Sequence, residues 1–278
     1  MISHILDVVT SAAILYVVAA GLLIVFGVMR IINFAHGGFL TMGGYSVLAV
    51  SNLGLNLLVA LPVSFIFGAV VGMAVERLVV RPLYARPLDA ILATWGLGIV
   101  IGQIITLAYD RGVQLVQNPI PGAVMVLGQN YSRYRIAMVA VALVFGVVLA
   151  SILRWTRLGL LTRAVIMNED LARGLGIDTG LIRFVTFSLG SGLACLAGAL
   201  ITPLSSVDPS LGTSWLVNAF MLVLASGASL ISLAIAAVVL GGAQVLISSY
   251  ANPVYGSMAI VILAALLLRI RPQGFARD

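Results

Sequence analysis

Long apolar runs follow one another along most of the chain, separated by short segments that carry the polar and charged residues. Several runs reach the roughly 20 mostly apolar residues that a helix needs to cross a membrane. In lipid, backbone amides are satisfied only within helices or closed barrels, and a barrel would show alternating segments of about ten residues. The pattern therefore predicts an all-α fold, a polytopic transmembrane helical bundle of eight or nine spans.

The predicted spans cover residues 8–29, 38–52, 57–78, 88–109, 136–154, 181–202, 215–226, 229–248 and 255–270. The second and the seventh are short for a full crossing, and we expect half-spans or broken helices there, which are tolerated where protein or a cavity covers the backbone. The first run lacks the basic region and cleavage site of a signal peptide, so we expect it to be retained. No soluble domain or linker interrupts the series, and residues 1–278 are predicted to form one transmembrane domain.

The composition agrees with a membrane protein, since 62% of the residues are hydrophobic and only 9% are charged, against about a quarter charged in soluble domains. The net charge is +6, and all fifteen basic residues are arginine. A Walker A nucleotide site and a Schiff base both need a lysine, so neither is expected. Because the arginines fall between the apolar runs, the basicity indicates membrane topology and not a nucleic-acid partner.

Arginine placement predicts which segments face the cytoplasm. Three clusters are expected there: Arg77, Arg81 and Arg86; Arg154, Arg157, Arg163, Arg173 and Arg183; and Arg269, Arg271 and Arg277. Alternation of the spans then places the N-terminus and residues 110–135 outside, although that segment also carries three arginines. A cytoplasmic C-terminus requires nine crossings, because eight would place it outside.

Ionisable residues are nearly absent from the middle of the spans, where they would indicate proton or ion coupling. Asp7 and Glu76 lie at span ends, and Asp89 and Asp110 bracket the fourth span. This distribution argues against an ion-driven secondary transporter. The single cysteine excludes an intrachain disulfide, and no Cys/His spacing typical of a metal site occurs. Paired acids or a nucleophilic dyad, which a membrane-embedded enzyme would need, are also missing from the pattern.

The segment "IINFAHGGFLTMGGY" is the most polar point near the start of a span. Asn33 and His36 precede the pair Gly37 and Gly38, and paired glycines bend helices and let backbone approach a solute. One interpretation is a broken helix at the translocation path. The other is a cytoplasmic turn between the first two spans, in which His36 caps a helix end.

Uncharged polar side chains within the spans offer two further candidates, Thr94 and Gln103 in the fourth span. Such side chains usually join helices by hydrogen bonds, and the alternative is contact with a polar substrate. Small residues also recur four apart, as in Gly68 and Gly72, Gly98 and Gly102, or Gly190, Ala194 and Gly198. This spacing predicts close helix packing, with a glycine-lined pore as the alternative.

The loop from Arg154 to Arg183 holds eight of the chain's charged residues. Within it, "AVIMNEDLARGLGI" predicts a short amphipathic helix that ends at Gly174 or Gly176. Such a helix lies in the lipid headgroup layer or inserts into a groove on a partner protein. Because acids are disfavoured against the anionic inner leaflet, Glu169 and Asp170 favour the partner.

Several stretches together resemble the branched-chain amino acid ABC transporter permeases, a family that includes urea and short-amide permeases. These are "TRLGLLTRAVIMNEDLARGLGIDTGLIRFVTFSLGSGLACLAGAL", "INFAHGGFLTMGGY", "ERLVVRPLYARPLDAILATWGLGI" and "RPQGF". The resemblance covers nearly the whole chain. It departs at residues 225–233, "ASGASLISL", where family members carry a glycine-rich turn and only Ser229 keeps its place, so we assign that turn no role.

The resemblance implies a permease subunit of an ATP-driven importer in the bacterial inner membrane. Its implied partners are a second permease, two cytoplasmic ATPases that bind ATP and Mg, and a periplasmic or extracellular substrate-binding protein, all beside membrane lipid. The loop at about 155–182 is then a coupling loop, whose implied ATPase-contacting residues are Asn168, Glu169, Asp170, Leu171, Arg173, Gly174 and Gly176.

The substrate that the resemblance favours is a branched-chain amino acid, with urea or a short amide as the alternative. A self-contained channel or facilitator for a neutral solute is the rival from another class. That rival shares the lack of charges in the middle of the spans, but it does not explain the charged loop of about 30 residues.

Overall fold

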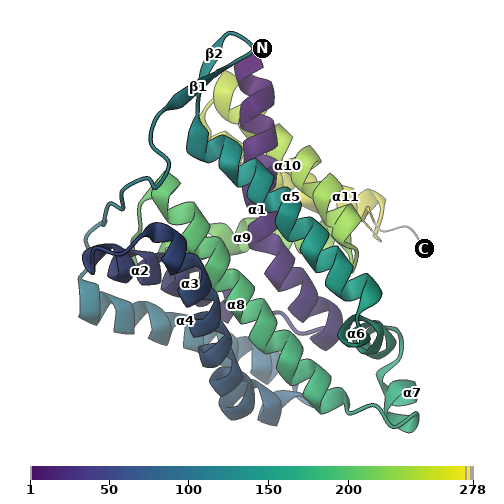
Figure 1. Ribbon diagram of the computed structural model, residues 1–278. Coiled ribbons are helices and arrows are strands. Elements are labelled where there is room, and N and C mark those ends of the chain that lie inside the picture. The colour runs from purple at the N-terminus through teal and green to yellow at the C-terminus, as the bar shows by residue number, and fades with distance from the viewer. Residues whose placement is uncertain (1, 273, 276–278) are drawn as a thin grey trace. The chain divides into compact units, whose positions relative to one another are not determined.

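The computed structural model describes residues 2–272 and 274–275. The long helices are α1 (Ile2–Met29), α2 (Ala35–Asn52), α3 (Leu57–Val75), α4 (Pro87–Tyr109), α5 (Arg133–Trp155), α8 (Thr179–Ser205), α9 (Leu211–Ser226), α10 (Leu230–Tyr250) and α11 (Pro253–Ile270). Each corresponds to one predicted span, and Figure 1 shows them with the shorter elements between them. The predicted all-α membrane bundle is confirmed.

Seven helices among the described residues are long and apolar enough to cross a membrane. The other two long helices, α2 with 18 residues and α9 with 16, occupy the spans predicted to be short. At about 1.5 Å per residue α9 extends roughly 24 Å, less than the ~30 Å hydrocarbon core, whereas α2 is as long as α11 and differs from it in carrying more polar residues and glycines.

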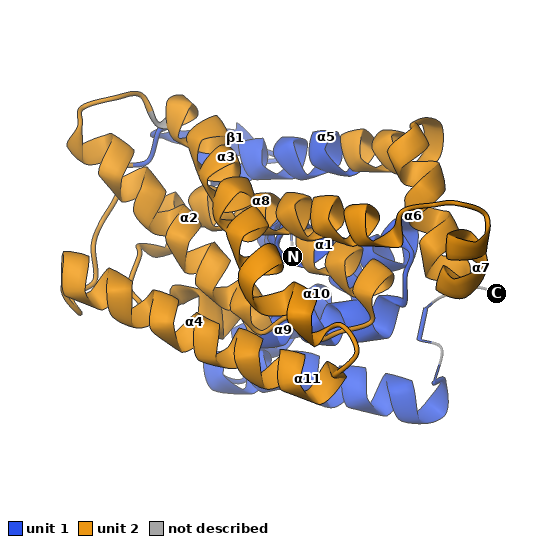
Figure 2. Ribbon diagram, turned by 90° about the horizontal axis from the view of Figure 1, so that it is seen from below, with its two compact units in different colours: residues 1–20, 118–146, 217–278 blue, residues 21–117, 147–216 orange. Residues whose placement is uncertain are grey.

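The chain divides into two compact units, shown in blue and orange in Figure 2. Unit 1 comprises the described parts of residues 1–20, 118–146 and 217–278, and unit 2 comprises residues 21–117 and 147–216. Helices α1, α5 and α9 continue from one unit into the other, so the division follows packing and does not separate two domains along the sequence.

Unit 1 contains a β-hairpin that the sequence pattern did not predict, formed by β1 (Ala123–Val126) and β2 (Gln129–Ser132). The hairpin lies beside the start of α1 (Figure 1), where the Tyr131 hydroxyl donates to Asp7 at 3.0 Å. Arg135 forms an ion pair with the same carboxylate at 2.9 Å. Asp7, at the end of a span, therefore serves to fasten the hairpin to α1.

The positions of the helix ends within unit 1 can be compared with the predicted membrane topology. His4 lies 5.4 Å from the Tyr250 ring, so the start of α1 and the end of α10 share one end of the unit. Helix α11 packs against α10 and runs back, which carries Arg269 and Arg271 to the opposite end. This arrangement agrees with N- and C-terminal segments on opposite sides of the membrane. Arg277 lies outside the described residues.

Unit 2 is built around α8, which packs closely against α2 and α3 through glycines. A Cβ atom on Gly198 would overlap the Leu40 carbonyl, and one on Gly43 would overlap the backbone of Cys195. On α3, a Cβ on Gly72 would come within 2.6 Å of Ser191 Cβ. Close packing, the predicted role of these small-residue stripes, is confirmed here.

Glycines on α4, unlike those on α8, leave room for a Cβ atom. A Cβ on Gly98 or Gly102 would meet its nearest neighbour at 3.5 or 3.8 Å, an ordinary van der Waals distance. Helix α4 instead packs through larger side chains, as Ile101 and Ile105 join Tyr45 of α2 in an apolar cluster. The small-residue spacing on α4 is therefore not required by close approach.

Candidate functional site

The charged loop folds into two helices joined by an elbow. Helix α6 (Arg157–Met167) begins where the Thr156 hydroxyl accepts a hydrogen bond from Gly159 N at 3.2 Å. Helix α7 (Glu169–Gly174) follows after a single residue, Asn168, whose backbone is extended at φ −158°. The prediction of one continuous helix through this stretch is wrong. Its end near Gly174 and Gly176 was predicted correctly.

Asn168 breaks the helix because its side chain caps the next one. Its Oδ1 accepts a hydrogen bond from Leu171 N at 3.0 Å, as an asparagine at an N-cap does. At the other end, Gly176 has φ +83°, its N–H donates to the Arg173 carbonyl, and Ile177 N–H donates to the Ala172 carbonyl. These bonds form a Schellman motif. A helix of only six residues is thus fixed at both ends.

Charge within α7 follows the helix dipole. Glu169 and Asp170 occupy its first turn and Arg173 its last, the arrangement that the partial charges of the helix ends favour. Glu169 pairs with Arg173 at 3.1 Å and also with Arg183, in the second turn of α8. Asp170 is exposed and lies outside these pairs. The ion pairs of Glu169 therefore hold α7 in place, while the Asp170 carboxylate is exposed at the surface.

Apolar side chains on the elbow are also exposed. Met167 is 83% exposed, Leu171 61% and Leu175 73%, whereas Ala172 is buried. Polar and charged residues surround these side chains, so the surface is amphipathic. Exposed apolar groups beside charges are typical of a surface that another protein covers.

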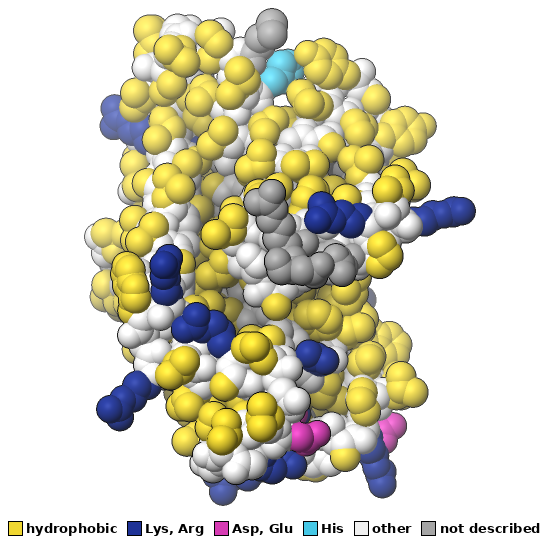
Figure 3. All heavy atoms as spheres, turned by 90° about the vertical axis from the view of Figure 1, so that its right-hand side faces the viewer, with side chains coloured by type: hydrophobic (Ala, Val, Ile, Leu, Met, Phe, Trp, Pro, Cys, Tyr) yellow, Lys and Arg dark blue, Asp and Glu magenta, His cyan; other side chains and the backbone are white. Residues whose placement is uncertain are grey.

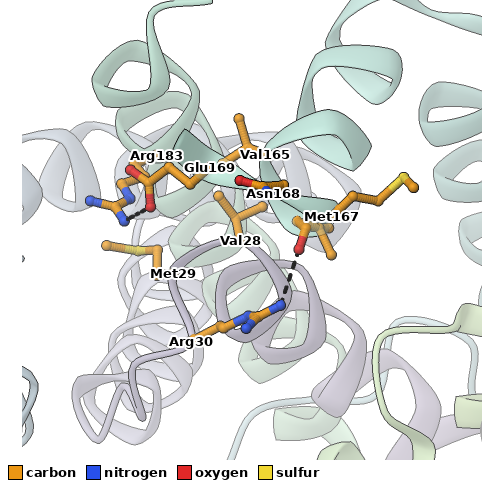
Figure 4. Close-up of a pocket in the computed structure, with 9 residues that line it drawn as sticks. Val28, Met29, Arg30, Val165, Met167, Asn168, Glu169 and Arg183 are labelled. Carbon is orange, nitrogen blue, oxygen red and sulfur yellow. Dashed lines mark hydrogen bonds and ion pairs between the residues drawn. The ribbon is translucent and has the colours of Figure 1, made fainter. Parts of the chain in front are cut away.

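The inner side of the elbow rests on the end of α1. Arg30, just past α1, donates to the Ile166 carbonyl at 3.2 Å. Figure 4 shows this bond and the Glu169–Arg183 pair on the wall of a cavity of about 350 Å³, which Val28, Met29 and Val165 also line. The elbow is thus attached by polar contacts at its edges and has open space beneath it.

Three of the candidate residues for the translocation path, Asn33, His36 and Thr94, lie near the start of α2. Asn33 and His36 are both buried, and Asn33 Oδ1 accepts a hydrogen bond from Ala35 N at 3.1 Å at the start of α2. The Asn33 side chain therefore contacts the backbone at the start of this helix. Thr94 is also buried there, and its hydroxyl accepts from Phe34 N at 3.3 Å.

The remaining path candidates have different surroundings. A Cβ on Gly37 would lie 3.0 Å from the Gly212 carbonyl, and one on Gly38 would lie 3.0 Å from Ile101 Cδ1, so these glycines allow α2 to approach α9 and α4. Gln103 is exposed. A role in translocation stays a prediction for all six residues.

Sequence reasoning assigned no role to three residues that the structure places beside the elbow, Arg30, Glu76 and Tyr84. Tyr84 lies under the Arg183 guanidinium, and its hydroxyl donates to the buried Glu76 carboxylate. The motif "ERLVVRPLYARPLD" contains two of the three residues, but its arginines suggested topology only. A glutamate at the very end of an apolar run was the signal that could have drawn attention to Glu76.

Comparison with known proteins places this architecture in a family. The family model described as "Branched-chain amino acid transport system / permease component" matches residues 4–270. The chain belongs to this family. As a member of it, the protein is a multi-pass membrane protein and a transport subunit, with seven long apolar helices among its described residues.

Individual relatives in the comparison extend over almost the whole chain. The permease LivH of a high-affinity branched-chain amino acid transport system from Escherichia coli (strain K12) is 27% identical, with 96% of this chain and 92% of the relative covered. BraD of Pseudomonas aeruginosa, from a similarly named system, is 25% identical over 92% and 89%. The ribose import permease RbsC of Escherichia coli (strain K12) is also 25% identical, over 98% and 87%.

Proposed function

We propose that this permease is the membrane-spanning subunit of an ATP-driven importer. Its expected partners are a second permease, two cytoplasmic ATPases that bind ATP and Mg, and a substrate-binding protein on the outer side. The observation that carries the proposal is α7, a short helix fixed at both ends that exposes apolar Leu171 and acidic Asp170 together. A helix of this kind suits a groove on a soluble protein.

The charges around α7 support its cytoplasmic location. The end of unit 2 that holds the elbow also holds Arg30, Arg81 and Arg86, as the contact between Arg183 and Tyr84 places the α3–α4 connection there. Arginine-rich connections face the cytoplasm in membrane proteins. Figure 3 shows a face on which hydrophobic side chains predominate, as contact with lipid requires, with arginine side chains scattered among them.

The substrate class that we favour is branched-chain amino acids. The family model and the names of LivH and BraD support this choice. Urea and short amides remain the alternative, and the similarity to RbsC shows that the relatives reach a sugar permease as well. The candidate path residues Asn33, His36, Gly37, Gly38, Thr94 and Gln103 are uncharged or weakly basic, which suits a small polar or zwitterionic solute.

Reversal of one exposed charge tests the docking role of α7. We expect Asp170→Arg to reduce co-purification of the ATPase subunits with this chain about tenfold, since a like-charge or unpaired contact at an interface costs on the order of 1–3 kcal/mol. Asp89→Arg is the matched control, because Asp89 is an exposed acid at the same end of unit 2. Equal co-purification of wild type and Asp170→Arg would contradict the assignment of α7.

A further inference from the structure

A buried carboxylate lies at the end of α3. Glu76 is the first residue of a π-helical turn, η1 (Glu76–Val80), and its side chain is fully buried. One carboxylate oxygen accepts a hydrogen bond from the Tyr84 hydroxyl, and among the described residues the other oxygen, Oε2, has no partner. A half-satisfied buried carboxylate is costly, and π-helical turns occur preferentially at functional sites.

Tyr84 connects this carboxylate to α8. It follows the 3-10 turn η2 (Arg81–Leu83), and the Arg183 guanidinium carbon lies 4.5 Å from the centre of its ring. Cation–π contacts of this geometry are attractive and become stronger when desolvated. Burial and, after it, the hydrogen bond to Glu76 raise the pKa of the Tyr84 hydroxyl, so that it remains a donor.

Arg183 connects the same contacts to α7. One of its terminal nitrogens pairs with Glu169, and its Nε is buried without a hydrogen-bond partner among the described residues. An unbroken series of side-chain contacts therefore runs from Glu169 on α7, through Arg183 and Tyr84, to Glu76 at the end of α3. Two buried atoms in this series, Glu76 Oε2 and Arg183 Nε, lack a hydrogen-bond partner among the described residues.

We propose that Arg183 and Tyr84 are positioning residues that transmit a displacement of α7 to the end of α3. The proposal rests on the proposed function, because a partner must move α7. The cavity beneath the elbow gives α7 room to move, and its ion pair with Arg183 makes the guanidinium follow. Because Tyr84 lies against that guanidinium and holds Glu76, the movement reaches α3, which packs tightly on α8 through Gly68 and Gly72.

A purely structural role for these contacts makes a different prediction. If Tyr84 served only to satisfy Glu76, then replacing both partners by apolar groups of similar shape would be nearly neutral, whereas removing one would not. The double variant Tyr84→Phe/Glu76→Met separates the two roles. It removes the hydrogen bond and the buried carboxylate together and keeps an aromatic ring beneath Arg183.

The experiment uses proteoliposomes that contain the whole transporter, purified with its partner subunits. Uptake of radiolabelled leucine and ATP hydrolysis are measured on the same preparation, together with the melting temperature of the assembly. We expect the double variant to melt like wild type and to transport about fivefold less leucine per ATP, or lower still, as coupling energies of 1–3 kcal/mol imply. Tyr250→Phe, an exposed tyrosine in unit 1, is the matched control and should keep the wild-type ratio.

A second variant covers the case in which the double variant does not assemble. Arg183→Lys keeps the charge opposite Glu169 and loses the planar group that stacks on Tyr84, so the leucine-to-ATP ratio should fall here too. A wild-type ratio in either variant overturns the proposal. Wild-type uptake that needs no ATP would instead overturn the proposed function, and the proposal with it.

Discussion

Single residues explain why a charged turn persists as defined structure in a chain with 9% charged residues. Asn168 ends one helix and caps the next, Gly176 supplies the positive φ that closes α7, and Asp178 caps α8 by accepting from Leu181 N at 3.0 Å. These are local backbone devices with recognisable sequence signatures. The residues were therefore identifiable from the sequence, although the break at Asn168 was not predicted.

At this scale we predict that Asn168→Ala loosens α7. Loss of an N-cap side chain costs about 1 kcal/mol, which corresponds to roughly fivefold faster local opening. Hydrogen–deuterium exchange of the peptide that covers residues 169–177 measures the change. Asn56→Ala, which removes the cap of α3, is the control and should affect exchange near Leu58 only. Unchanged exchange in α7 would show that the cap does not hold it.

Helices are the scale at which the sequence was most informative. Continuous apolar runs predicted every long helix, because the membrane permits few other structures. The β-hairpin was missed, since residues 110–135 carry no strong alternation and the hairpin depends on tertiary contacts with Asp7. The side-chain contacts that connect Glu169 to Glu76 through Arg183 and Tyr84 were missed for the same reason. They join residues about 90 positions apart, which no local sequence pattern relates.

The predicted packing role of the glycines can be tested at this scale. We expect Gly198→Ala to destabilise the protein by about 1–3 kcal/mol, because the new methyl group would overlap the Leu40 carbonyl and force α2 from α8. Gly96→Ala on α4 is the control, since nothing lies within 4 Å of the added atom and alanine favours a helix by about 1 kcal/mol. The melting temperature in detergent should fall for the first and be unchanged or higher for the second.

Across the whole molecule, membership of the permease family and the arrangement of the helix ends lead to one account. In the function that we propose, the permease supplies spans without charges in their middle, and partner subunits that bind at α7 supply the energy for transport. The turn at residues 225–233 departs from the family pattern, yet it is well defined: Ser229 caps α10 by accepting from Ser232 N at 3.4 Å, and Phe275 N donates to the Ala225 carbonyl at 2.7 Å. Gly274 and Phe275 thus pack on this turn, a contact that the sequence did not reveal.

The most direct test of the account is leucine uptake into vesicles that carry the full assembly, measured with and without ATP. The account predicts uptake that requires ATP, is reduced by excess isoleucine and not by urea, and falls to background in Glu169→Arg/Asp170→Arg while the permease still inserts. Uptake that continues without ATP and ignores the charge reversal would contradict it and identify a facilitator.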